Sequence, residues 1–71
     1  MEDPFDALTA REREVFQLVA EGQTSVEISE RMGISARTVD VYRSNIMHKL
    51  NLKNTADLIR LALKRGILPE E

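Results

Sequence analysis

The chain has 71 residues, no Cys and a net charge of −2 at neutral pH, which suits one small domain in which every helix contributes to a single core. The absence of Cys excludes a disulfide framework and a Cys-based zinc site, and it favours a reducing, cytoplasmic location. No apolar run approaches the roughly 20 residues of a membrane span, and the acidic residues 1–10 do not resemble a signal peptide, so we expect a soluble protein.

Residues 1–8 are predicted to form a flexible lead-in, because their proline and acidic residues precede the first clear helix cap. The first helix is expected over residues 10–21. Thr9 and Glu12 have the spacing of a capping box, in which each side chain satisfies a free amide of the other residue. Apolar residues then recur at helical spacing as far as Gly22, which favours the end of a helix.

A short second helix and a third helix follow with little chain between them. Thr24 or Ser25 can cap the second helix, and Gly33 suits the left-handed position after it. Ser35 can cap a third helix, which is expected to run to about Leu50. A tight turn of about three or four residues with a glycine between two helices is the helix-turn-helix arrangement.

A fourth helix is expected after a short connection. Asn54 can cap it, Asp57 lies in its favourable first turn, and Gly66 suits its end. No stretch has strand-like alternation of useful length, and no segment repeats. The predicted fold is therefore all-α with four helices, as a helix-turn-helix domain over residues 9–68 and a tail over residues 69–71.

Charge is distributed unevenly along the chain. Residues 1–35 hold three Arg and eight Asp or Glu, whereas residues 36–65 hold seven Arg or Lys and two Asp. The acidic net charge alone argues weakly against a polyanionic partner, because nucleic-acid binding draws on positive surface. The basic second half argues the other way and indicates a side that faces nucleic acid.

The third helix is predicted to have two different faces. At about 100° per residue, Val39 and Ile46 belong to one apolar stripe that suits the core. The opposite face carries short or hydrogen-bonding groups and a lone valine, which can approach base edges in a DNA major groove. The alternative is an ordinary solvated face, because such residues are common on any surface. The candidate base-reading residues are Arg37, Asp40, Val41 and Ser44.

Other residues are candidates for phosphate contacts. The free amides and hydroxyls at the start of the second helix suit an anion, and lysines near the end of the third helix can bind phosphate. Helix capping and pairing with the helix dipole explain the same residues without a ligand. These candidates are Thr24, Ser25, Lys49 and Lys53.

The fourth helix is more apolar than a surface helix of a small monomer requires. Beside its core side, a second edge formed by Thr55, Ile59 and Leu63 lies on roughly one line. Such a patch can meet its own copy across a two-fold axis and form a homodimer. The alternative is a broader contact with the core.

Several stretches together resemble the LuxR/FixJ/NarL-type helix-turn-helix domain across residues 8–67. They are "LTAREREV" in the first helix, "EISERMGISARTV" through the turn and "NIMHKL" at the end of the third helix, followed by a fourth helix. The resemblance implies the DNA-binding output domain of a bacterial transcription regulator, of the response-regulator kind found in two-component systems. It implies double-stranded DNA as partner, a homodimer formed through the fourth helix, RNA polymerase as a candidate partner and no cofactor.

The resemblance also implies roles for particular positions. Family members usually carry an upstream receiver or ligand-binding domain, which we do not expect within these 71 residues. Many relatives have Lys or Arg where this chain has Asp40 and Ser44, so salt-dependent attraction to DNA is expected to be modest here. The implied base-reading positions are Asp40, Val41 and Ser44. The implied DNA-backbone contacts are Thr24, Ser25, Arg37, Thr38 and Lys53.

Two other functions fit parts of the sequence. Region 4 of a sigma factor shares the "REREV" stretch and a similar turn, although the fourth helix argues against it. A helical protein-interaction module without DNA binding fits the acidic net charge. An enzyme is not expected, because the single histidine, His48, has no predicted nucleophile or carboxylate partner, and the chain has no Gly-rich phosphate loop or metal-ligand cluster.

Overall fold

The computed structural model describes residues 3–69, and every regular element in that range is a helix. A 3-10 helix, η1 (Pro4–Ala7), precedes the four α-helices α1 (Ala10–Ala20), α2 (Ser25–Met32), α3 (Ala36–Lys49) and α4 (Thr55–Lys64). The all-α class and the four predicted helices are confirmed. None of the helices within residues 3–69 is long and apolar enough to cross a membrane.

Side-chain caps start all four α-helices where the sequence predicts them. Each cap oxygen accepts a hydrogen bond from the backbone amide of the third residue of its helix. In α1 and α2 the side chains of the third residues, Glu12 and Glu27, accept a hydrogen bond from the backbone amide of the cap and complete capping boxes. The caps are Thr9, Thr24, Ser35 and Asn54.

The turn between α2 and α3 is as short as predicted. Gly33 has a φ of 70°, in the left-handed region that glycine enters without a steric cost. The backbone amides of Gly33 and Ile34 both donate to the carbonyl of Ser29, at 2.9 and 3.1 Å. These bonds end α2 and reverse the chain, so that the cap of α3 follows immediately.

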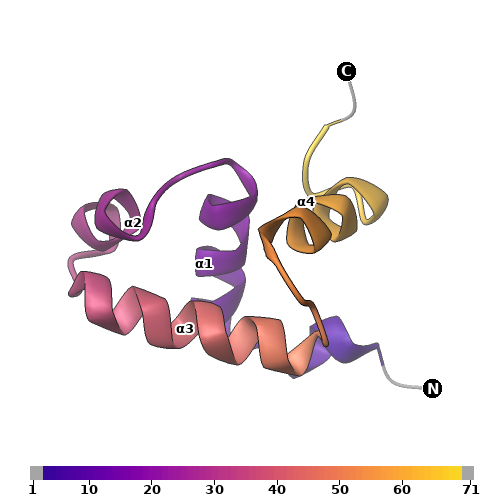
Figure 1. Ribbon diagram of the computed structural model, residues 1–71, viewed down its shortest axis with the longest axis horizontal. Helices are drawn as coiled ribbons and strands as arrows, with labels where there is room; N and C mark the ends of the chain where they lie inside the picture. Colours follow the sequence, from indigo (N-terminus) through magenta and orange to yellow (C-terminus); the bar gives the residue numbers. More distant parts are fainter. Residues whose placement is uncertain (1–2, 70–71) are drawn as a thin grey trace.

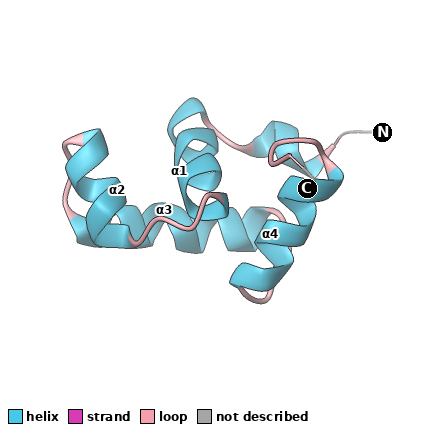
Figure 2. Ribbon diagram, turned by 90° about the horizontal axis from the view of Figure 1, so that it is seen from above, coloured by secondary structure: helices cyan, strands magenta, loops and turns pink. Residues whose placement is uncertain are grey.

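The core lies between α1 and the helices around it. Figure 1 shows α3 along one edge of the molecule, with α1, α2 and α4 on the same side of it. Seen from above in Figure 2, α1 lies across α3, between α2 and α4. The largest side chains buried between these helices are Val15, Phe16, Ile28, Val39, Ile46 and Leu58. Each contributes about 1.5–3 kcal/mol by leaving water.

Residues 3–8 differ from the predicted flexible lead-in. Phe5 packs edge-on against Phe16, with ring centroids 5.2 Å apart, and Leu8 is buried in the core. The proline that suggested a linker begins the 3-10 helix η1, where its fixed φ is favourable. The lead-in therefore belongs to the fold from residue 3 onward, while residues 1–2, like residues 70–71 of the predicted tail, lie outside the described range.

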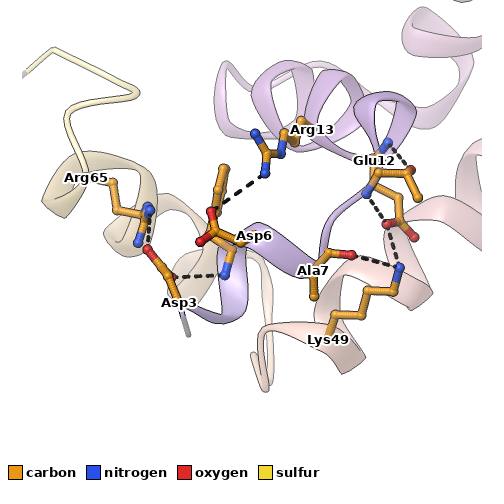
Figure 3. Close-up of polar contacts among 9 residues, drawn as sticks. Asp3, Asp6, Ala7, Glu12, Arg13, Lys49 and Arg65 are labelled. Carbon is orange, nitrogen blue, oxygen red and sulfur yellow. Dashed lines mark hydrogen bonds and ion pairs between the residues drawn. The ribbon is translucent and has the colours of Figure 1, made fainter. Parts of the chain in front are cut away.

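Ion pairs hold η1 against the rest of the domain (Figure 3). Asp3 pairs with Arg65, just after α4, at 2.6 Å, and Asp6 pairs with Arg13 of α1 at 3.8 Å. Both arginines also lie over the ring of Phe5, at 4.5 Å for Arg65 and 5.4 Å for Arg13. The Arg65 guanidinium donates to Asp3 and holds the pKa of that carboxyl below its ordinary value.

Candidate nucleic-acid interface

The face of α3 turned away from the other helices carries a row of exposed side chains at helical spacing. Arg37, Val41, Ser44 and His48 are all exposed, while Val39 and Ile46 on the opposite face are fully buried. Val41 is 54% exposed, and only Val26 of α2, at 59%, is a comparably exposed large apolar side chain within residues 3–69. The two faces of α3 are therefore divided as the sequence predicts.

Asp40 lies at the edge of this row and contacts the neighbouring helix. The hydroxyl of Ser25, the first residue of α2, donates to Asp40 Oδ1 at 2.6 Å. The structure thus joins a predicted base-reading residue to a predicted phosphate contact. The sequence contains no signal for this pair, because the two residues are 15 positions apart and belong to different helices.

Two further exposed hydroxyls lie at the start of α2 and in the first turn of α3, those of Thr24 and Thr38. Thr24 Oγ1 accepts from the amide of Glu27 at 3.2 Å, and the hydroxyl is exposed to solvent with its hydrogen still free to donate. Thr38 is also exposed, and its hydroxyl lies 2.9 Å from that of Ser35, the cap of α3. Both side chains can still reach an anion at the surface.

Lys49 is occupied within the fold. Its ammonium donates to Glu12 Oε1 at 2.8 Å and to the carbonyl of Ala7 at 3.3 Å (Figure 3). Glu12 is almost fully buried and also accepts from the backbone amide of Thr9. The Lys49 ammonium beside Glu12 holds the pKa of that carboxyl below its ordinary value. The same lysine that the sequence assigns to phosphate thus ties α3 to α1 and to the end of η1.

The basic residues of the second half divide into two groups. Within residues 3–69, Lys49, Arg60 and Arg65 are each paired with a carboxylate of this chain. Four others form no ion pair in that range and keep their charge available to a polyanion: Arg37, Arg43, Lys53 and Lys64. Arg43 is half-buried beside the apolar stripe of α3. Arg43 is not among the contacts predicted from the sequence.

The second apolar edge of α4 is separate from the core. Leu58 and Ala62 are buried, and the half-buried Leu61 packs against the core. Ile59 and Leu63 are half-buried but do not belong to the set of apolar side chains that pack there within the described residues. Thr55 at the start of the helix is exposed.

Polar contacts fix the start of α4. Asp57 Oδ2 accepts from the backbone amide of Lys53 at 3.2 Å, and Asp57 Oδ1 is paired with Arg60 at 2.5 Å. The Arg60 guanidinium donates to Asp57 and holds the pKa of that carboxyl below its ordinary value. The Lys53 side chain itself is exposed at the surface of the connection between α3 and α4. No cluster of three His, Asp or Glu suited to a metal ion occurs within residues 3–69.

Comparison with known proteins shows the family of the chain. The sequence model described as bacterial regulatory proteins, luxR family, matches residues 6–62. The chain is 42% identical over 66 residues to the oxygen regulatory protein NreC of Staphylococcus carnosus (strain TM300). It is 41% identical over 66 residues to the proteins of that name from Staphylococcus epidermidis (strain ATCC 12228 / FDA PCI 1200) and Staphylococcus aureus (strain JH9). Each match covers 93% of this chain and 30% of the relative, so the chain spans less than a third of their length.

Proposed function

The chain belongs to the luxR family of bacterial regulatory proteins, and we propose that it binds double-stranded DNA sequence-specifically with α3 in the major groove. The family is one of DNA-binding transcription regulators and not of enzymes. The observation that carries the groove assignment is the exposed row on α3, with Val41 at its centre and α1, α2 and α4 all on the other side of the helix (Figure 1).

The dimensions and the chemistry of α3 both suit the major groove. Its 14 residues span about 21 Å, and the groove is about 12 Å wide and admits one helix. Val41 can cover a thymine methyl, Asp40 can accept from cytosine N4, and Ser44 can bond either kind of base edge. Arg37 can bind guanine or the adjoining phosphate.

Phosphates would be held by groups on both sides of this row. Thr24 can donate its hydroxyl hydrogen, and Ser25 can offer its backbone amide at the start of α2. Thr38, Arg43 and Lys53 add contacts from α3 and from the connection that follows it. Lys49 is not part of the proposed interface, because its ammonium is bound to Glu12 and Ala7.

On DNA, the domain is proposed to form a homodimer through α4. Ile59 and Leu63 are the large apolar side chains of this helix that do not pack against the core within the described residues, and Thr55 extends the same edge. A two-fold contact would bury this edge against its own copy and place two α3 helices on paired half-sites.

The domain is further proposed to be the output domain of a longer regulator. The greater length of the NreC proteins supports this role, because the matched part is 30% of each. An upstream receiver or ligand-binding domain would then control the domain, and RNA polymerase would meet it on DNA. The match to the luxR family and the presence of α4 both favour this function over a region 4 of a sigma factor.

Selection from a random DNA pool tests the proposed function. The 71-residue chain should enrich a defined sequence, and Val41→Glu should abolish specific binding while the helical circular-dichroism spectrum is retained. Ala10→Glu is the charge-matched control, because it adds the same carboxylate at an exposed site in the first turn of α1. Unchanged affinity of Val41→Glu for the enriched duplex would refute the assignment of α3. Failure of the chain to enrich any sequence would favour a protein-interaction module.

A further inference from the structure

One hydrogen bond joins the two helices of the helix-turn-helix at the edge of the proposed interface. The Ser25 hydroxyl donates to Asp40 Oδ1 at 2.6 Å. Ser25 is half-buried at the first position of α2, and Asp40 is exposed in the second turn of α3. A hydroxyl has a single hydrogen, so this donation leaves Ser25 no hydrogen for a phosphate oxygen.

Asp40 does not pair with the cations closest to it along its own helix. Arg37 and Arg43 each lie three positions away in sequence, a spacing at which a carboxylate and an arginine form an ion pair on a helix surface. Within residues 3–69, Asp40 forms no ion pair with either arginine, and its Oδ2 has no hydrogen-bond partner. Ser25 therefore holds the carboxylate by one oxygen and leaves the other one available.

We propose that Ser25 is a positioning residue that holds the Asp40 carboxylate for base reading, and so sets a preference for cytosine at one position of the DNA site. This inference rests on the proposed function. An ionised carboxylate only accepts hydrogen bonds, and in the major groove cytosine presents the N4 amino group as donor. Guanine O6 and N7 and thymine O4 present acceptor lone pairs, which disfavour a fixed carboxylate, and adenine places its N6 donor beside the N7 acceptor, which opposes the same carboxylate.

Removal of the Ser25 hydroxyl changes which groups can bind the Asp40 carboxylate. Without that bond, rotation of the side chain brings the carboxylate within reach of Arg37 or Arg43. The ion pair then competes with the base for the free oxygen, and it also neutralises an arginine that would otherwise meet phosphate. The effect of Ser25 on recognition therefore acts through Asp40 and requires Asp40 to be present.

The experiment compares base preferences at fixed salt. The duplex enriched from a random pool by the 71-residue chain is made with each of the four base pairs at every position, and dissociation constants are measured. In Asp40→Ala, the preference for cytosine over the other bases at one position, given as a ratio of dissociation constants, should fall by about tenfold. Ser25→Ala should weaken the same preference by about threefold or more. Ser25→Thr, which keeps a hydroxyl, should restore it.

Two controls separate positioning from a general structural effect. Ser29→Ala makes the same truncation in α2, where the hydroxyl donates to the carbonyl of Val26 in its own helix, and it should leave the base preference unchanged. In an Asp40→Ala background, Ser25→Ala should cause no further loss of preference. Circular dichroism and thermal unfolding establish that all variants are folded.

The outcomes distinguish this inference from the proposed function. If the chain enriches no sequence, the proposed function fails and this inference fails with it. If a sequence is enriched, but Ser25→Ala keeps a cytosine preference that Asp40→Ala loses, only the positioning role of Ser25 is overturned. The positioning role is also overturned if Ser29→Ala loses as much of the cytosine preference as Ser25→Ala, or if Asp40→Ala leaves the preference unchanged.

Discussion

Replacement of Glu12 by alanine should destabilise the domain more than any other single change of a charged residue in α1. The Glu12 side chain is 4% exposed, and one of its oxygens accepts from both Lys49 Nζ and the amide of Thr9, at 2.8 Å each. In Glu12→Ala both donors lose this acceptor. Because Glu12 binds the Lys49 ammonium, which also donates to the carbonyl of Ala7 at the end of η1, the loss weakens the contact between α1 and α3 and removes the anchor of that lysine.

The size of the effect follows from the exposure of the two donors. A hydrogen bond to a charged group contributes about 1.5–3 kcal/mol to stability. Its removal costs less when the donor can form a hydrogen bond to water instead. The Lys49 side chain is 34% exposed, so its hydrogen bond contributes near the lower end of this range. The total loss of unfolding free energy in Glu12→Ala is about 2–4 kcal/mol. A domain of this size has a free energy of unfolding of about 4–10 kcal/mol. The melting temperature should therefore fall by about 10–25 °C.

Urea and thermal unfolding followed by circular dichroism measure this loss. Glu14→Ala is the matched control, because Glu14 is exposed two positions away in the same helix and forms no ion pair within residues 3–69. Its unfolding free energy should stay within about 0.5 kcal/mol of the unmodified chain. Equal losses in Glu12→Ala and Glu14→Ala would refute the role assigned to the buried carboxylate.

Three further predictions concern pH, salt and dimerisation. Hydrogen bonding to Lys49 lowers the pKa of Glu12 in the folded state. The stabilisation by the ionised Glu12 is therefore fully present above the ordinary glutamate pKa and is lost as pH falls through the lower folded-state value. The difference in unfolding free energy between the unmodified chain and Glu12→Gln, measured by urea unfolding, should shrink on acidification. Lys53→Ala should lower affinity similarly for all duplexes and reduce the salt slope by about one unit in titrations at several salt concentrations, and a sequence-selective loss would mean that Lys53 reads bases. Ile59→Asp and Leu63→Asp should weaken binding to a paired site more than to a half-site in mobility-shift titrations, and equal losses on both would count against dimerisation through α4.

Sequence patterns predict best those features that depend on residues close together in the sequence. A capping box joins residues three positions apart, so Thr9 with Glu12 could be recognised from the sequence alone. Gly33 was predicted in the same way, because a left-handed residue after a helix favours glycine. The two faces of α3 follow from helical periodicity, which also separates the exposed Val41 from the buried Ile46.

Contacts between distant residues were the part that the sequence did not predict. Lys49 and Glu12 are 37 positions apart, and a helical wheel places a lysine on a face without naming its partner. The acidic residues and the proline of residues 1–8 favour a flexible lead-in, whereas in the structure Phe5 packs edge-on against Phe16 of α1, a partner that no local pattern names. Ser25 and Asp40 were each assigned to DNA, whereas the structure bonds them to each other.

The central claim, that α3 reads bases from the major groove, is tested most directly with inosine. An I·C pair presents the major-groove pattern of G·C but lacks the guanine amino group, so its minor groove matches that of A·T. At each A·T pair of the enriched duplex where G·C weakens binding, I·C should weaken it equally, by about 1–3 kcal/mol. If I·C binds as well as A·T at those positions, the domain reads the minor groove and the assignment of α3 is wrong.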